Sequence, residues 1–327
     1  MFYNTDIKRK GESAMKRQQA FTKKGTFLKG GLHCHTTRSD GRLTPEETLR
    51  YCASQGYDFQ ALTDHQIYNL TNFAPETGIV LIPGMEYAND LEHGRGYRCF
   101  HTVCIGPEKE NGNGFNQDDK FPWGYEPDSE AYQPMLDEIH SKKNLTILCH
   151  PQWSNTSAKY FETQKGNFAM EIYNSGCAML TDSDDDAAYW DELLGKGIRW
   201  YGVATDDAHT INELCKGWVM VKAEKNVTSI LEALEKGEFY SSCGPEIYDF
   251  YVENGKAIID CSPVSRVRLH CDKHPNLVIT DPEGNITHAE FDIVNHWAGL
   301  YDYVRISLVD AAGKKAWTNP IFFDEDC

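Results

Sequence analysis

Between Phe27 and Phe239, short apolar runs typical of β-strands alternate with segments typical of α-helices. Such alternation favours βα units and therefore a largely parallel sheet or barrel. Beyond Phe239 the helical pattern stops, and strand-like runs separated by turns predict an all-β unit, which we expect to be a small sandwich. We therefore expect an N-terminal leader at residues 1–26 that is loosely held or helical, an α/β domain at 27–240 and a C-terminal β domain at 246–327.

Capping and turn residues place several elements within the α/β region. Thr44-Pro45-Glu46-Glu47 predicts the start of a helix, because Thr is a good N-cap, Pro suits the first helical position and Glu completes a capping box. That helix should end near Gln55, with Gly56 after it. Further helices are expected at 134–142, 184–196 and 227–236, strands at 59–63, 79–82, 99–105, 145–149, 168–173 and 198–204, and a long loop at 107–128.

The charge and the cysteine content exclude several classes of protein. Lys and Arg number 32 and Asp and Glu number 49 among the 327 residues, so the net charge is −17. A surface this acidic repels the phosphates of nucleic acids and membranes, and no apolar run is long enough to predict a spanning helix. The eleven cysteines are scattered without a C-x-x-C, which argues against a disulfide framework or a zinc ribbon. Residues 1–30 lack the apolar stretch of a signal peptide, so we expect a cytoplasmic protein.

Histidines and carboxylates recur at the ends of the predicted strands. Six of the twelve histidines close a strand-like run or follow one, and three acidic residues occupy similar positions. These nine residues are His33, His35, Asp40, His65, Glu86, His101, His150, Asp207 and His209. Because the carboxyl ends of strands in βα architectures converge on one face, we expect these side chains to lie close together. Imidazole and carboxylate are ligands for Zn, Mn and Fe, so the pattern predicts a metal site.

Some of these assignments have alternatives. A single histidine is more often an ordinary hydrogen-bonded residue than a ligand, whereas nine metal-competent residues at successive strand ends rarely arise by chance. Asp206 is an alternative to Asp207, although the D-x-H spacing favours Asp207, and His93 lies near His101. His140 falls on a predicted helix and is not expected to bind metal.

Five motifs in order resemble those of the PHP (polymerase and histidinol phosphatase) domain. They are His33-Cys34-His35 with Ser39-Asp40-Gly41, then Thr63-Asp64-His65, Gly84-Met85-Glu86, Cys149-His150-Pro151 and Asp207-Ala208-His209. The resemblance covers about residues 27–240. It looks closest to the stand-alone metal-dependent phosphoesterases, including a branch that carries a trailing β domain and contains carbamate and ester hydrolases.

The resemblance implies a distorted seven-stranded (β/α) barrel and two or three divalent ions, Mn, Fe or Zn. It implies one ion held by His33, His35, Glu86 and Asp207, a second held by Glu86, His101 and His150, and a third held by Asp40, His65 and His209. Glu86 and Asp207 are then candidate catalytic residues. Asp64 is a third candidate, either as an acceptor behind a ligand or as a capping aspartate. Arg38 either holds a substrate phosphate or is a solvated arginine, and Glu171 and Asn174 are candidates for lining the pocket.

These inferences predict a metal-dependent hydrolase of the phosphoric ester class, which hydrolyses a small-molecule phosphate ester with a metal-bridged hydroxide. Three divalent ions against three carboxylate ligands leave about three positive charges, enough to attract a phosphate to an acidic protein. The same hydroxide attacks a carbonyl carbon, so a metal-dependent carboxylester or carbamate hydrolase is the alternative. A non-catalytic binding protein with a metal-stabilised scaffold is the third candidate.

Overall fold

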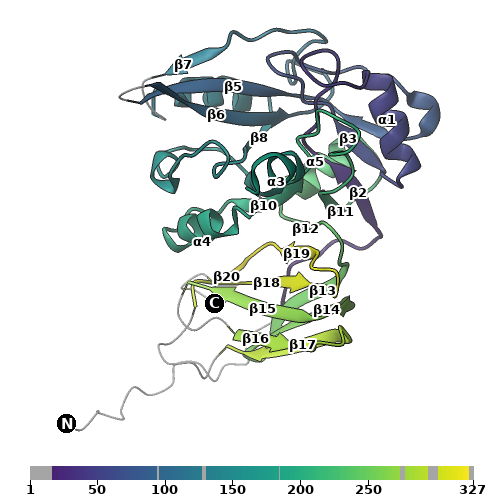
Figure 1. The fold of residues 1–327 in the computed structure, drawn as a ribbon, viewed down its shortest axis with the longest axis vertical. Coiled ribbons are helices and arrows are strands. Elements are labelled where there is room, and N and C mark those ends of the chain that lie inside the picture. Colours follow the sequence, from purple (N-terminus) through teal and green to yellow (C-terminus); the bar gives the residue numbers. More distant parts are fainter. Residues whose placement is uncertain are drawn as a thin grey trace. The chain divides into compact units, whose positions relative to one another are not determined.

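The computed structural model describes residues 17–93, 96–126, 130–183, 185–272, 277–293 and 301–323. The protein divides into two compact units (Figure 1). One unit comprises Lys23–Cys243. The other comprises Gly244–Cys327 together with Met1–Thr22.

The Lys23–Cys243 unit is mixed α/β, with five described α-helices and eleven described strands. The helices are α1 (Pro45–Ser54), α2 (Gln133–Ser141), α3 (Ser175–Thr181), α4 (Ala187–Gly195) and α5 (Val227–Glu235), and two single 3₁₀ turns lie at Pro75–Thr77 and Ala158–Tyr160. The strands are β2 (Phe27–Gly31), β3 (Phe59–Ala61), β4 (Val80–Ile82), β5 (Gly84–His93), β6 (Gly96–Ile105), β7 (Gly124–Glu126), β8 (Leu145–Leu148), β9 (Ala169–Asn174), β10 (Tyr201–Thr205), β11 (Trp218–Lys222) and β12 (Phe239–Ser242). Five strands lie in the order β12-β11-β2-β3-β4, and six in the order β10-β9-β8-β6-β5-β7.

The strands of this unit are only partly parallel. β2, β3 and β4 run parallel to one another, as do β8, β9 and β10. β6, in contrast, runs antiparallel to both β5 and β8. β5 and β6 are consecutive strands that pair along their whole length, and an antiparallel pair needs no crossover helix. The expectation of a largely parallel sheet is therefore wrong for this part of the unit.

Two isolated parallel bridges connect the two sets of strands, outside the regular pairing within each set. Cys34 pairs with Ala208 after β2 and β10, and His65 pairs with Glu86 after β3 and within β5. Both bridges bring predicted metal-binding motifs side by side. A closed seven-stranded barrel stays a prediction, because the described strands form two sheets that meet through these bridges.

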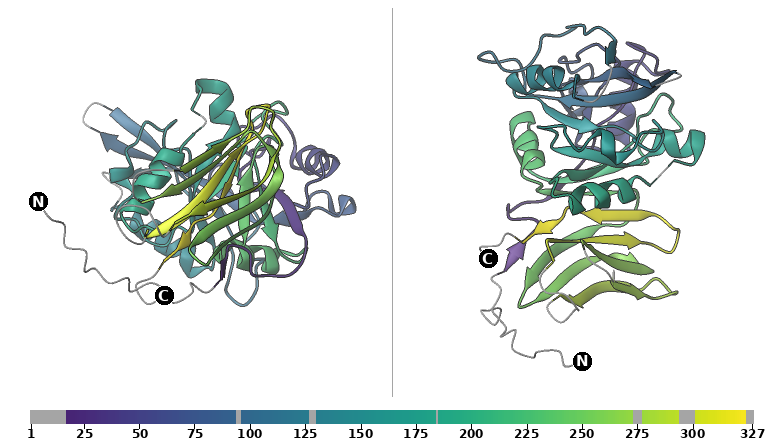
Figure 2. Two further views of the ribbon diagram at one scale, coloured as in Figure 1. Left: turned by 90° about the horizontal axis from the view of Figure 1, so that it is seen from below. Right: turned by 90° about the vertical axis from the view of Figure 1, so that its left-hand side faces the viewer.

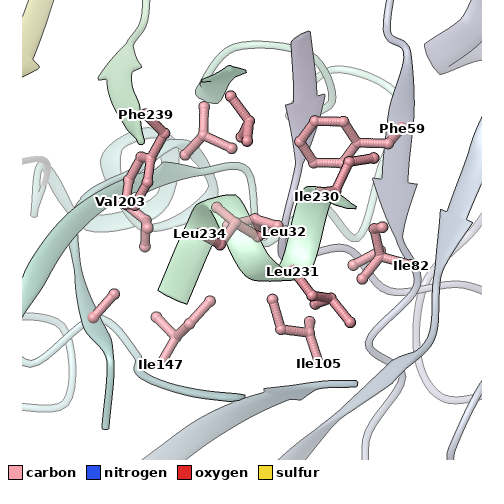
Figure 3. Packing of buried hydrophobic residues seen from close by; sticks show 14 of the residues in the cluster. Leu32, Phe59, Ile82, Ile105, Ile147, Val203, Ile230, Leu231, Leu234 and Phe239 are labelled. Carbon is pink, nitrogen blue, oxygen red and sulfur yellow. The ribbon is translucent and has the colours of Figure 1, made fainter. Parts of the chain in front are cut away.

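Helix α5 packs at the centre of an apolar core that both sheets share. Its Ile230, Leu231 and Leu234 are buried among side chains from β2, β3, β4, β6, β8 and β10 (Figure 3). Each buried side chain of this kind stabilises the fold by roughly 1.5–3 kcal/mol. Along β6 the alternate residues His101, Val103 and Ile105 lie on one face, since side chains repeat every second residue in a strand. Val103 and Ile105 join this core, so His101 extends the same interior face toward a polar region.

The capping signals place α1 as predicted. Thr44 is its N-cap, the Glu47 amide donates to Thr44 Oγ1 over 3.2 Å, and the Thr44 amide donates to the Glu47 carboxylate over 2.9 Å. The helix ends with Gln55 as C-cap, and Gly56 follows with φ +77°. This confirms the capping box and the position of the helix.

Other predicted elements need correction. Helix α3 was not predicted, because its seven residues directly follow β9 without a turn. The segment expected to be a long loop, 107–128, ends in β7, which pairs with β5. Residues 1–16 of the leader lie outside the described residues. Gln18–Gln19 form the strand β1, which pairs with β13 (Ile247–Glu253), so this part of the leader is neither helical nor loosely held.

In the described part of the second unit, every regular element is a strand. Beside β1 and β13 these are β14 (Lys256–Val264), β15 (Arg266–Cys271), β16 (Leu277–Thr280), β17 (Ile286–Asp292), β18 (Tyr303–Val309), β19 (Lys315–Thr318) and β20 (Ile321–Phe322). One sheet has the order β1-β13-β14-β17, and the other has the order β16-β15-β18-β19 with β20 beside β18 (Figure 2). In β15, buried Val267 and Leu269 alternate with exposed Arg266 and Arg268, as expected for a strand with one face on a core.

Two negative findings concern the described residues alone. Ten cysteines lie within them, and none forms a disulfide. No helix within them is both long and apolar enough to cross a membrane.

Candidate metal centre

The structure brings all nine predicted metal-binding residues into one cluster. They form overlapping groups in which one ligand atom of each residue lies within 4.8 Å of the others. The groups are His33, His35, Glu86 and Asp207; His65, Glu86 and His101; Glu86, Cys149 and His150; His33, Cys149 and Glu171; and His35, Asp40, His65 and His209. Glu86 belongs to three of the five, which makes it the centre of the cluster.

Glu86 is a buried carboxylate surrounded by imidazoles. Its Oε2 lies 3.0 Å from His65 Nδ1, 3.2 Å from His35 Nε2 and 3.4 Å from His33 Nε2. Its Oε1 lies 3.0 Å from His101 Nδ1 and 3.5 Å from His150 Nε2. Neither oxygen has a hydrogen-bond partner within the described structure, and the residue is 1% exposed. The two oxygens thus face two different sets of imidazoles.

The H-x-H motif uses the period of an extended chain, as the sequence predicts. His33 and His35 lie on the same side, with their Nε2 atoms 3.1 Å apart, and Asp207 Oδ1 lies 3.2 Å and 3.1 Å from these two atoms. Cys34 lies between them in the sequence and belongs to a different, apolar cluster with Leu49 of α1.

The group that contains Asp40, His65 and His209 lies on the open side of the cluster. Asp40 Oδ1 lies 3.5 Å from His209 Nε2, and Asp40 Oδ2 lies 3.7 Å from His65 Nε2. The Asp40 side chain is 55% exposed, in contrast to the buried Glu86. A ligand from solvent therefore reaches this group more directly than the groups that contain Glu86.

His101 lies in the middle of β6 and not at a strand end as expected. β6 runs antiparallel to β5 and β8, so its carboxyl end lies at the opposite edge of the sheet from theirs. The edge at which the parallel strands end therefore lies beside an earlier residue of β6 and not beside its last one. His101 Nε2 lies 2.8 Å from Cys99 Sγ, which leaves Nδ1 facing Glu86. The side chain of the alternative, His93, lies outside the described part of the structure.

Glu171 supports the cluster from behind, and sequence reasoning had considered it only for lining the pocket. Its Oε1 lies 2.7 Å from His33 Nδ1 and accepts a 2.7 Å hydrogen bond from Thr205 Oγ1. Its Oε2 accepts hydrogen bonds of 2.9 Å from the His150 amide and from Asn174 Nδ2. A carboxylate that binds the outer nitrogen of an imidazole fixes the tautomer and orientation of that ring. The sequence signal was an acidic residue at the end of a predicted strand.

Asp64 holds the loop of the first motif and does not belong to the cluster. It accepts hydrogen bonds from the amides of Thr36 and Ser39, over 2.7 Å and 3.1 Å, and from Asn69 Nδ2 over 2.9 Å. The loop itself is tight, since a Cβ on Gly41 would lie 2.5 Å from the carbonyl oxygen of His35. Asp64 therefore acts through the loop that carries Asp40.

The structure separates the two neighbouring aspartates of the last motif. Asp206 points away from the cluster and accepts hydrogen bonds from the amides of Cys215, Lys216 and Gly217, over 2.6 to 2.8 Å. Asp207 joins the cluster, with φ +48°. A positive φ is uncommon for a residue other than glycine.

Arg38 is directed toward a neighbouring loop. Its guanidinium pairs with Asp118, which belongs to the 107–128 segment, and lies 5.7 Å from the ring of Phe73. The first motif and the long segment are thus joined by a charged pair beside the cluster.

Crowding of carboxylates and imidazoles shifts their pKa values. Burial alone lowers the pKa of His35, but the nearby carboxylates of Asp207 and Glu86 outweigh it and raise the pKa to about 10. The pKa of Glu86 lies well below its usual range, because the surrounding histidines, led by His101, outweigh the effect of burial. Burial lowers the pKa of His65 to about 4. Without a metal, protons on imidazoles balance the buried carboxylates.

Comparisons with known proteins give partial similarities. Over 82 residues the chain is 43% identical to the 5′-3′ exoribonuclease of Haemophilus influenzae, a match that covers 24% of this chain and 28% of that relative. Over 41 residues it is 44% identical to the DNA polymerase/3′-5′ exonuclease PolX of Bacillus subtilis, covering 12% of this chain and 7% of the relative. The chain thus spans less than a third of either relative. No family model matches it.

The solved structures that are similar to the chain include the following two. A two-domain protein of Bacteroides vulgatus, which contains a predicted PHP-like metal-dependent phosphoesterase, matches 91% of this chain and 95% of its own, with a TM-score of 0.48 and 15% identity. An amidohydrolase of Chromobacterium violaceum matches 56% of this chain and 88% of its own, with a TM-score of 0.40 and 13% identity.

Proposed function

We propose that the protein is a metal-dependent phosphoesterase of PHP type. The observation that carries the proposal is the environment of Glu86, a buried carboxylate that faces five imidazoles and has no hydrogen-bond partner in the described structure. An uncompensated buried carboxylate is costly, and burial is tolerated when the group is paired or coordinates a metal. Divalent ions on its two sides would satisfy both oxygens.

The donor set fits two or three ions of Mn, Fe or Zn, which accept imidazole and carboxylate ligands. One ion would be held by His33, His35, Glu86 and Asp207, a second by Glu86, His101 and His150, and a third by Asp40, His65 and His209. In this proposal, the two bridged sheets form a distorted barrel, and these residues lie in the polar part of its interior.

The residues behind the ligands hold protons and orient rings. Glu171 would accept a hydrogen bond from His33 Nδ1–H, which leaves the Nε2 lone pair of that ring free for a metal. Ser154 Oγ lies 3.0 Å from His150 Nδ1 and serves the same purpose there. Bound divalent ions would supply Lewis acidity and lower the pKa of a coordinated water toward about 7.

The proposed third site, formed by Asp40, His65 and His209, favours a phosphate ester over a carboxylester as the substrate. A phosphomonoester brings two charges and three terminal oxygens, whereas a carboxylester offers one carbonyl oxygen. A third ion near the exposed Asp40 therefore adds more to phosphate binding than to carbonyl activation. Arg38 would hold the phosphate by exchanging Asp118 for it.

The two sequence relatives support the same choice, because both are named for exonuclease activity, which cleaves phosphodiester bonds. Each match covers a small part of the relative, so the screen below includes phosphodiesters beside phosphomonoesters.

The decisive experiment is a substrate screen after reconstitution with Mn, Fe or Zn. The screen compares phosphomonoesters, phosphodiesters and carboxylesters, and inorganic phosphate is added as a competitor. Turnover of a phosphate ester with competitive inhibition by phosphate supports the proposal. Brisk turnover of aryl carboxylesters that is indifferent to phosphate supports a carboxylester or carbamate hydrolase instead. Full metal occupancy without turnover of any ester supports a metal-stabilised binding protein.

A further inference from the structure

Two exposed tryptophans lie beside the candidate metal centre. Trp123 is 42% exposed and Trp153 is 38% exposed, and in the described part of this unit they are the two exposed large aromatic residues. Their ring centroids lie 6.2 Å and 6.3 Å from that of His101. Trp123 also lies 6.0 Å from His65, and Trp153 lies 4.8 Å from His150. Both indoles therefore border the ligands of the proposed second ion.

The backbone around Trp123 is fixed to the second motif. The Phe121 amide donates to the Gln66 carbonyl over 3.0 Å, and Gln66 Nε2 donates to the Pro122 carbonyl over 2.9 Å. Gln66 directly follows His65, so both attachments position the indole relative to a proposed ligand. The indole itself donates from Nε1 to Asp90 over 3.1 Å.

Trp153 is fixed in a similar way to the third motif. The Ser154 amide donates to the His150 carbonyl over 3.0 Å, and Ser154 Oγ contacts the same residue's ring. On the other side, the Gln152 amide donates to the buried Asp186 carboxylate over 2.9 Å. Two separate segments thus each hold one exposed indole at the edge of the centre.

We propose that Trp123 and Trp153 bind a planar aromatic group in the leaving-group part of the substrate. This inference rests on the proposed phosphoesterase function and specifies its substrate class. Indole faces attract flat rings through dispersion and quadrupole interactions. A quaternary or other cationic group also binds indoles, but several divalent ions beside it would repel it. A neutral aromatic ring therefore fits both the tryptophans and the centre.

Non-hydrolysable phosphonates separate ring binding from catalysis. Calorimetry on the metal-loaded protein compares phenylphosphonate, cyclohexylphosphonate and methylphosphonate. We expect phenylphosphonate to bind about tenfold more tightly than methylphosphonate, as aromatic stacking allows. Trp123→Ala and Trp153→Ala should each reduce this preference several-fold without changing metal content or the affinity for methylphosphonate, and Trp153→Phe should retain most of it. Tyr248→Ala, at an exposed aromatic residue of the other unit, is the matched control.

Each other outcome overturns a specific part of this inference. A phenyl preference that survives in the double Trp→Ala variant excludes the tryptophans as the binding site. Equal affinities for the cyclohexyl and phenyl compounds exclude a requirement for a planar ring. Failure of all three phosphonates to bind contradicts the proposed phosphate chemistry. In that case the affinity for benzoate is compared with the affinity for acetate. Equal affinities for the two compounds would exclude an aromatic site at the tryptophans.

Discussion

Two buried glutamates in the same interior have opposite environments. Glu171 accepts hydrogen bonds from a hydroxyl, a backbone amide and a side-chain amide and also contacts an imidazole, so both of its oxygens are satisfied by the protein. Glu86 faces five imidazoles, and neither of its oxygens has a hydrogen-bond partner in the described structure. A satisfied buried carboxylate orients its neighbours, whereas an unsatisfied one among ligand nitrogens is complete only with a cation.

The same contrast separates the central cluster from the residues around it. Asp64 and Asp206 are buried like Asp207, but backbone amides donate to both residues, and Asn69 Nδ2 also donates to Asp64. Burial raises the pKa of Asp206 to about 6 despite these hydrogen bonds. Asp207 lies against His33 and His35, which outweigh burial and keep its pKa below the usual range. The carboxylates of the centre thus lie mainly against imidazoles, whereas those around it accept several hydrogen bonds from amides.

The largest effect is expected for Glu86→Gln. The amide preserves size but removes the charge that faces both sets of imidazoles, so the protein should lose at least one equivalent of metal. Activity should then fall by orders of magnitude, on the scale of several kcal/mol for one Lewis acid. Elemental analysis and kinetics with the preferred ester measure both effects. Retention of full metal would show that Glu86 does not bridge two ions.

A large but more selective effect is expected for Asp40→Ala. This side chain lies on the open side of the cluster and belongs to the proposed third site. Its loss should remove that ion and lower phosphate ester hydrolysis by several kcal/mol in the activation barrier, since one Lewis acid is lost. Any carboxylester activity should change little. Equal loss of both activities would contradict a special role of the third site in phosphate binding.

Glu171→Gln tests the supporting region directly and should have an intermediate effect. The amide keeps the size of the side chain but weakens the hold on His33 Nδ1. Residues that orient metal ligands typically contribute 10–100-fold in metal affinity, so we expect a loss of about that size with the same number of ions at saturation. A change in stoichiometry, measured by titration and elemental analysis, would place Glu171 among the ligands.

Metal loading should strengthen with rising pH. The pKa of His35 is about 10 in the metal-free protein, so this imidazole carries a proton at neutral pH that a metal must displace. Ligand deprotonation makes affinity pH-dependent, and for one displaced proton the dissociation constant should fall about tenfold per pH unit up to about pH 10. Calorimetry in buffers of different ionisation enthalpy counts the released protons. Binding without proton release would contradict the protonated state of His35.

The sequence predicts which residues cluster better than it predicts the residues that support them. His33-Cys34-His35 and Asp207-Ala208-His209 are local patterns whose spacing alone brings two side chains together. The contact between His33 and Glu171 joins positions 138 residues apart, and no local pattern reveals it. His101 is the opposite case. The sequence correctly indicates that His101 belongs to the cluster but predicts that it lies at a strand end, whereas it lies in the middle of β6. That place depends on the antiparallel direction of β6, which only the pairing with β5 and β8 defines.

The smallest effect is expected for His140→Ala, a histidine of the same unit that lies on α2 outside the cluster. Its Nε2 lies 2.9 Å from Thr146 Oγ1, and its ring fills the space that a Cβ on Gly166 would need. Loss of one partly buried hydrogen bond should reduce the free energy of unfolding by about 1 kcal/mol. Metal content and activity should not change, because no atom of His140 faces a proposed ion.

The pH dependence of this small effect has a defined sign. Burial lowers the pKa of His140 below its ordinary value, so the folded protein favours the neutral ring. The contribution of His140 is therefore present above about pH 6.5 and is lost as the pH falls and the unfolded chain takes up the proton. The stability difference between the wild type and the variant, measured by chemical denaturation, should shrink below that pH. A loss of metal in the variant would instead mean that the boundary between the centre and its surroundings lies farther out than Glu171.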